Sequence, residues 1–363
     1  MLRQGILLLL LFLLIGSCDE HKVNSDADIL AVAYSPEDYP INYPKEFPKP
    51  APVPDNPLTK DGVQLGRFLF YDPILSSDSS QSCSSCHNPR VSFSDNLAFP
   101  KGVTGIEGPR SSMSLLNVVY FNKGLFWDGR SATLEKQALE PVENPIELHE
   151  AWPNVESKLR KHPLYPFMFR KAFGIESRDQ ITKELAVKAI AQFERIIVGG
   201  NNSLYFKQER GEIFFNSDQQ DGKDIFFDLE PLIQDGECSH CHAVPLFTAN
   251  DYFNNGLDSA ANYHDFKDVG HGKVSGIASD TGKFKAPSLI NIELTAPYMH
   301  DGRFKTLEEV MEHYNSGGHG APNRNPLIYN LKLTAREKKK VIAFLKALTD
   351  TTYLSNKDIL SPF

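Results

Sequence analysis

Two short motifs combine cysteine and histidine in a spacing that suits one kind of chemistry. Both have the pattern Cys-x-x-Cys-His, at residues 83–87 and 238–242. Two thiols three residues apart on a helical turn can each add to a vinyl group of the same haem, and the histidine that follows reaches the iron. A thioredoxin-like redox pair or one four-cysteine zinc site would not explain a histidine after each motif. We therefore expect two covalent c-type haems, held by Cys83, Cys86 and His87 and by Cys238, Cys241 and His242.

An internal repeat indicates which elements position these motifs. The stretch Trp127-Asp128-Gly129-Arg130 recurs 173 residues later as His300-Asp301-Gly302-Arg303. Each half contains a haem motif, a loop, an Asp-Gly-Arg turn and a helix that starts at Thr133 or Thr306. Because strand patterns are scarce, the sequence predicts a mostly α protein. We expect two cytochrome c-like domains, at 58–215 and 216–363.

Two further helices follow from periodicity and capping. Residues 179–198 carry apolar side chains at three- and four-residue spacing, which predicts an amphipathic helix. Thr334 and Glu337 have the pattern of a capping box, which opens another helix. Between the second haem motif and its Asp-Gly-Arg turn, residues 248–284 are predicted as a long loop.

The first 57 residues predict an export signal and a spacer. Residues 1–17 contain Arg3, an apolar run and a small pair at the end, which is typical of a signal peptide. The run is shorter than the roughly 20 residues of a membrane-spanning helix. Ile15 to Cys18 resembles a bacterial lipobox, so Cys18 is expected to carry a lipid. Residues 18–57 contain eight prolines and predict an extended, lipid-anchored spacer. These features predict a location in the periplasm or at the cell surface, with the protein anchored to a bacterial membrane.

Composition narrows the class of partner. The 363 residues include 38 Lys and Arg and 46 Asp and Glu, for a net charge of −8. A hydrophobic share of 41% and a charged share of 23% are ordinary for a globular protein. The negative net charge argues against nucleic-acid binding. The charge favours a basic partner protein over an acidic one.

From about Pro57 onwards the chain resembles the bacterial di-haem cytochrome c peroxidases and their relative MauG. Four stretches carry the likeness, at 65–72, 126–130, 143–147 and 297–303, with both haem motifs in register among them. The resemblance implies that peroxide reacts at the His87 haem and that the His242 haem receives or stores electrons.

The resemblance also assigns side chains around the first haem. Trp127 matches a tryptophan that lies between the two haems, and Gln137 and Glu147 match the distal glutamine and glutamate. Peroxide cleavage needs a base that takes a proton from one oxygen and returns it to the leaving oxygen, and a partly buried carboxylate can do this. The resemblance therefore implies catalytic roles for Trp127, Gln137 and Glu147.

One departure from the family pattern concerns the open face of the first haem. Family peroxidases that need reductive activation carry a distal histidine on the loop after the first motif, and it blocks the iron. Between Asn88 and Trp127 this chain has no histidine. We therefore expect a five-coordinate or water-ligated first haem that reacts with peroxide without prior reduction.

The sixth ligand of the second haem and a calcium site are open questions. Tyr314 stands where many family members place a methionine and MauG places a tyrosine, and Met311 is the alternative, one turn earlier. Methionine would raise the reduction potential, whereas a phenolate would favour oxidised iron. Family members also bind Ca²⁺ through carbonyls that match Thr295 and Pro297. Ser111 replaces the expected asparagine, so the site would need water as a ligand.

The leading interpretation is a di-haem peroxidase that reduces hydrogen peroxide to water with electrons from a small cytochrome or cupredoxin. A MauG-like enzyme that uses peroxide to oxidise residues of a partner protein is the second interpretation. A non-enzymatic two-haem electron carrier is the third, but it leaves Glu147 and Gln137 unexplained. Members of the family are often dimers, so a homodimer is compatible with the resemblance.

Overall fold

The computed structural model describes residues 26–363 except 231 and 233. The expected signal peptide and lipid-bearing Cys18 lie outside the described residues. As predicted, the described part is mostly helical. Its α-helices are α1 Ala27–Leu30, α2 Lys60–Tyr71, α3 Cys83–Cys86, α4 Leu134–Glu143, α5 Trp152–Lys161, α6 Tyr165–Phe173, α7 Lys183–Arg195, α8 Leu204–Glu209, α9 Ser217–Phe227, α10 Gly272–Ser275, α11 Leu307–Ser316 and α12 Ala335–Lys346. Two short antiparallel strands, β1 Tyr252–Phe253 and β2 Phe284–Lys285, form a small sheet.

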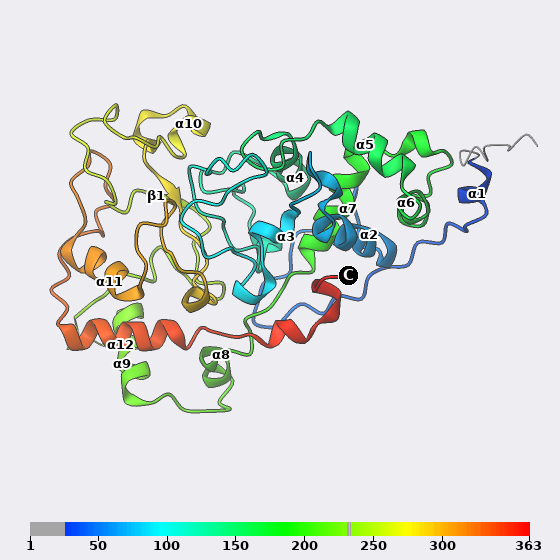
Figure 1. Cartoon of the computed structure of the whole chain (residues 1–363). Helices are drawn as coiled ribbons and strands as arrows, with labels where there is room; N and C mark the ends of the chain where they lie inside the picture. Colours follow the sequence, from blue (N-terminus) through cyan, green and yellow to red (C-terminus); the bar gives the residue numbers. More distant parts are fainter. Residues whose placement is uncertain (1–25, 231, 233) are drawn as a thin grey trace, which may run out of the picture.

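The helices gather in two groups. Figure 1 shows α2 and α4 to α7 on one side and α9, α11 and α12 on the other, with the haem-motif helix α3 between them. Within each group two helices approach very closely at a glycine. A Cβ on Gly66 of α2 would lie 1.9 Å from the Ala189 carbonyl oxygen of α7. A Cβ on Gly222 of α9 would lie 2.0 Å from the carbonyl oxygen of Lys340 in α12.

The internal repeat has a matching structure in both halves. Thr133 caps α4 by accepting a hydrogen bond from the Lys136 amide, and Thr306 caps α11 in the same way. The preceding turns are closed by β-bridges at equivalent positions, Leu125 with Ser131 and Tyr298 with Phe304. Gly129 and Gly302 have φ of +80° and +63°, a region that favours glycine. The Asp-Gly-Arg stretches are therefore tight turns that lead into helices, as the sequence predicts.

The predicted start is confirmed for α12, whereas α7 begins later in the chain than predicted. The capping box of Thr334 and Glu337 is present and opens α12. The helix expected over 179–198 is shorter, because residues 178–180 form a separate 3₁₀ turn capped by Ser177, and α7 begins only at Lys183. Local capping thus overrides the apolar periodicity at this end.

The residues after α12 return to the first group of helices (Figure 1). The Tyr353 hydroxyl donates to the Pro89 carbonyl at 2.6 Å, and the Tyr71 hydroxyl of α2 donates to the Ile359 carbonyl at 2.7 Å. One hydrophobic core includes residues of both halves and of the predicted spacer, from Phe47 to Ile359, whereas a second surrounds α2, α5, α6 and α7. Within the described residues, no helix is long and apolar enough to cross a membrane.

Candidate active site

The first haem motif opens onto a cavity of about 1000 Å³, here called the first cavity. Helix α3 begins after Ser82, which forms a capping box with Ser85. The His87 amide then donates to the Cys83 carbonyl at 3.0 Å, so Cys83 and Cys86 lie one turn apart. All three motif side chains line the cavity, and both cysteines are free thiols. This is the arrangement that covalent attachment of one haem requires.

The His87 imidazole is held in one orientation. Its Nδ1 lies 2.9 Å from the Phe93 carbonyl oxygen, so Nδ1 carries the proton and Nε2 remains to bind a metal. Burial lowers the pKa of His87, which keeps the ring neutral. Phe93 has φ of +57°, and this left-handed turn directs its carbonyl back to the histidine.

The first cavity also contains the side chains expected to handle protons. Gln137 of α4 and Glu147, from the turn after α4, both line it. The Asn144 amide donates to one Glu147 carboxylate oxygen at 2.6 Å and orients it. Burial raises the pKa of Glu147. Among the residues that line the cavity, His87 is the only histidine.

The second haem motif lines a narrower cavity of about 220 Å³, the second cavity. The His242 amide donates to the Cys238 carbonyl at 3.0 Å, which closes the turn between the two cysteines. His242 Nδ1 lies 3.2 Å and 3.1 Å from the carbonyl oxygens of Phe247 and Pro287, so Nε2 is again free. Burial lowers the pKa of His242 to about 4.

Both candidates for a sixth ligand line the second cavity. The Tyr314 hydroxyl accepts a hydrogen bond from the Asn255 amide at 3.2 Å, and the same amide lies 3.4 Å from the sulfur of Met299. Burial raises the pKa of Tyr314 to about 12. Met311 is 4% exposed and belongs to the core. The geometry keeps both Tyr314 and Met311 as alternatives.

Trp127 lines both cavities. Its indole Nε1 donates to the Ser111 carbonyl at 2.9 Å, which fixes the ring. The Ser111 hydroxyl donates to the Met299 carbonyl at 3.0 Å. Ser111, Thr295 and Pro297 all line the second cavity, and calcium binding there stays a prediction.

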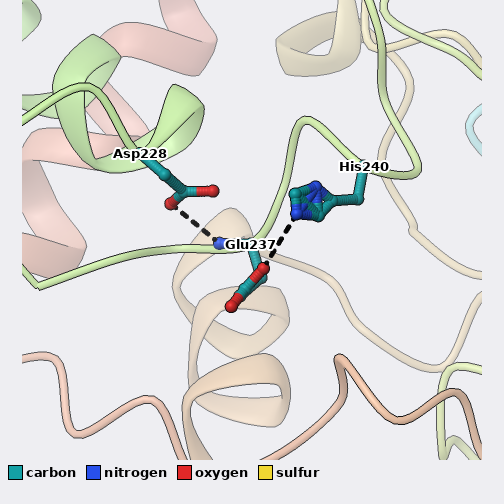
Figure 2. A group of neighbouring side chains, drawn as sticks. All are labelled: Asp228, Glu237 and His240. Carbon is teal, nitrogen blue, oxygen red and sulfur yellow. Dashed lines mark hydrogen bonds and ion pairs between the residues drawn. The ribbon is translucent and has the colours of Figure 1, made fainter.

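His240 lies inside the second motif but does not line the second cavity. Figure 2 shows its ring directed at Glu237, with Nε2 3.1 Å from the carboxylate. Among the described residues, Asp228, Glu237 and His240 form the single group of three or more His, Cys, Asp or Glu whose ligand atoms lie within 4.8 Å of one another. The four haem-motif cysteines therefore form no common zinc site.

Sequence reasoning missed two buried titratable groups at these cavities. Glu194 of α7 is 4% exposed and lines the first cavity, and its Oε2 has no hydrogen-bond partner. Burial raises the pKa of Glu194 to about 8. Lys285 of β2 is 3% exposed and lines both cavities. Nothing in the local sequence distinguishes either residue from a surface charge.

The residues present fit two haem groups. Each motif supplies two free thiols and a neutral imidazole with a free Nε2. In the first cavity, the Glu194 side chain has a buried oxygen for which the described residues provide no hydrogen-bond partner. The first cavity has the size of a cofactor site, whereas the second is below the usual lower limit of about 300 Å³. At the second motif, the evidence for a haem is therefore the two thiols and the imidazole, and not the size of the cavity.

Comparison with known proteins agrees with this geometry. Residues 60–212 match the family model of the di-haem cytochrome c peroxidases. The chain is 33% identical over 295 residues to the methylamine utilization protein MauG of Methylorubrum extorquens, covering 81% of this chain and 79% of MauG. It is 32% identical to the cytochrome c551 peroxidase of Nitrosomonas europaea, covering 81% of each protein.

A solved structure shares the whole architecture. The crystal structure of a MauG-like protein associated with microbial copper homeostasis superposes with a TM-score of 0.80 at 32% identity, covering 89% of this chain and 99% of that protein. The mostly helical fold is thus common to both proteins, and the family implies two haem c groups. The chain belongs to the family of di-haem cytochrome c peroxidases and MauG, and it is a peroxidase-type oxidoreductase.

Proposed function

We propose that the protein reduces hydrogen peroxide to two waters at the first cavity, with two protons and two electrons from a small cytochrome or cupredoxin. The observation that supports this is the pair Glu147 and Gln137 in a cavity with no second histidine. A haem held by Cys83, Cys86 and His87 would supply the electrons that cleave the oxygen–oxygen bond.

Side chains of the protein transfer the protons that this reaction requires. Glu147 accepts a proton from one oxygen of peroxide and returns it to the other oxygen, which leaves as water. Its raised pKa brings it nearer to neutral pH, where a base can also act as an acid. Gln137 donates hydrogen bonds that hold peroxide in place.

Electrons reach the first cavity from the second. Trp127 lines both cavities and is proposed as the group between them, and Tyr314 is proposed as the sixth ligand of the second iron. Because His87 is the only histidine among the residues that line the first cavity, peroxide is proposed to be reduced there without prior reductive activation. The domains at 58–215 and 216–363 are proposed to divide these two tasks.

Stopped-flow absorption of the fully oxidised, haem-loaded protein tests this proposal. Mixed with one equivalent of peroxide, the oxidised protein should change its Soret band at once, and a reduced small cytochrome should then restore it over repeated turnovers. The resting spectrum should contain a high-spin component from the open first haem. A reaction that begins only after the second haem is reduced would contradict an open first site.

The charge around the second motif supports a basic electron donor. Residues 224–266 contain eight acidic residues and no Lys or Arg, although the whole chain has a net charge of only −8. Within this stretch Asp251 pairs with Lys123, Asp258 with Arg303, and Glu237 with His240. The other five carboxylates have no ion pair among the described residues, so the surface attracts cations.

The donor reaction should therefore depend on salt. Raising the ionic strength from about 10 mM to 1 M should lower kcat/KM for a basic cytochrome roughly tenfold, because the Debye length falls from about 30 to 3 Å. The kcat/KM for neutral peroxide, measured in parallel, should stay unchanged. A donor rate that rises with salt would contradict an acidic docking surface.

A second candidate function is peroxide-dependent oxidation of residues on a partner protein, as proposed from the similarity to MauG and from Tyr314 in the second cavity. In that case the species formed with peroxide would persist when the small cytochrome is added. Under either function, we propose a location in the periplasm or at the cell surface, with a lipid on Cys18 as the anchor.

A further inference from the structure

Lys285 is a buried cation without an anionic partner. Its side chain is on β2 and the residue is 3% exposed. The Nζ donates to the Asn250 side-chain oxygen at 2.8 Å and lies 3.4 Å from the Lys123 carbonyl oxygen. No carboxylate among the described residues forms an ion pair with it. A buried charge is costly unless it is compensated, so its retention here points to a use for the charge.

Aromatic rings and neutral dipoles replace a counter-ion at this position. Lys285 pairs with Tyr252 across the small sheet, and its ammonium lies 4.8 Å from the centre of the Tyr252 ring. The Phe121 ring centre is 5.9 Å away. Such contacts stabilise a cation without neutralising it. The positive charge therefore remains available to the surroundings.

Lys285 is also tied to the residue between the two cavities. Its main-chain N–H donates to the Trp127 carbonyl at 2.8 Å, and its side chain lines both cavities. Lys285 thus links the small sheet of the second half to the tryptophan loop of the first half.

The charged and titratable groups facing this ammonium are Asp251, Lys123 and Tyr252. Asp251 is engaged by Lys123, with 2.5 Å between their charged atoms. Burial lowers the pKa of Lys285 to about 8, and the attraction of Asp251 opposes part of that effect. Burial raises the pKa of Tyr252 to about 12, so its hydroxyl stays neutral. At pH 7 most Lys285 side chains are therefore positive.

We propose that Lys285 is a positioning residue for electron exchange: its ammonium fixes a positive charge in the wall that the two cavities share, which favours the reduced state of both haems. This rests on the proposed roles of the two cavities and of Trp127. Single electrons pass from the second haem to the first, and Lys285 keeps all its bonds and protons throughout. The consequence is that each haem takes up an electron more readily than it would without this charge.

Spectroelectrochemical titration of the haem-loaded protein in the absence of peroxide tests this role. Lys285→Met keeps the length of the side chain and removes the charge. It should shift the one-electron reduction equilibrium of both haems about tenfold toward the oxidised state, or about 59 mV. Lys283→Met is the matched control, because Lys283 lies just before the same strand, is 27% exposed and pairs with Asp280. It should leave both potentials unchanged.

A pH series provides a second readout that needs no charge-removing variant. In the wild type both potentials should fall as pH rises through about 8, since the ammonium loses its proton. In Lys285→Arg, which stays charged, this fall should disappear. Equal potentials in Lys285→Met and the wild type, or the same pH series in Lys285→Arg, would overturn the proposal. Because no peroxide is present, failure of the proposed peroxidase activity would be detected separately.

Discussion

Glu147→Gln should lower kcat/KM for hydrogen peroxide by roughly 10²–10⁴-fold, the usual contribution of a positioned acid–base group. Glutamine preserves the shape and the contact with Asn144 but cannot take and return a proton. Both haems should remain attached, because Glu147 lines the cavity but is not part of the Cys83, Cys86 and His87 motif that would hold the haem. Initial rates of peroxide consumption with a reduced cytochrome would measure the effect.

The control for this variant is Glu143→Gln. Glu143 is the last residue of α4, is exposed and does not line the first cavity. It should retain wild-type kcat/KM. If Glu147→Gln also does so, Glu147 is not the group that transfers the proton during peroxide cleavage. The pH profile adds a further check: because burial raises the pKa of Glu147, activity should decline on acidification at a higher pH than an exposed glutamate would cause.

Arg110→Ala should lower the free energy of unfolding by about 3 kcal/mol, because it removes the cation that Asp268 pairs with in a largely buried region and leaves Asp128 with Arg130 alone. Arg110 donates to Asp128 at 2.7 Å and to both oxygens of Asp268 at 2.7 and 2.8 Å. The side chains of Arg110, Asp128 and Asp268 are 16%, 6% and 28% exposed. Urea unfolding of the haem-loaded protein would measure the loss.

The control is Lys60→Ala, which removes an ion pair with Glu37 whose side chains are 54% and 67% exposed. It should cost at most about 1 kcal/mol. A loss no greater than this in Arg110→Ala would contradict a structural role for the buried network. Since Asp128 and Asp268 come from loops of different halves, the same variant should also loosen the wall of the first cavity that residues 267–274 form.

The effect of Arg110 should depend on pH in a defined direction. Burial alone would raise the pKa of Asp128 and of Asp268, but the hydrogen bonds and charge of Arg110 hold both below their usual range. Groups with depressed native pKa values contribute stability above the unfolded value of about 4 and lose it as pH falls through the native value. The difference between wild type and Arg110→Ala should therefore be largest near neutral pH and shrink on acidification.

The sequence predicted the parts of the site that depend on local signals. The haem motifs, the turns at Gly129 and Gly302 and the caps at Thr133 and Thr306 involve residues a few positions apart, so their patterns are visible in one dimension. The start of α7 was misplaced because the capping of residues 178–180 by Ser177 competes with apolar periodicity.

Long-range contacts were not predictable in this way. Arg110 and Asp268 are 158 positions apart, and Lys285 meets the Trp127 carbonyl from the opposite half. Burial of Glu194 and Lys285 results from how the two groups of helices pack, and no short pattern encodes it. The choice between Tyr314 and Met311 stays open for a related reason: both side chains line the same cavity, and only the iron would distinguish them.

The segment after α12 has a consequence for the order in which the molecule can be assembled. Tyr353 and the carbonyls of Ile359 and Leu360 cover Pro89, Tyr71 and Arg67 of the first half, yet they follow the entire second half in the chain. During synthesis the first half must therefore wait with part of its surface uncovered until the second half has emerged. The two haem-binding halves are completed together, which couples their maturation even though each has its own attachment motif.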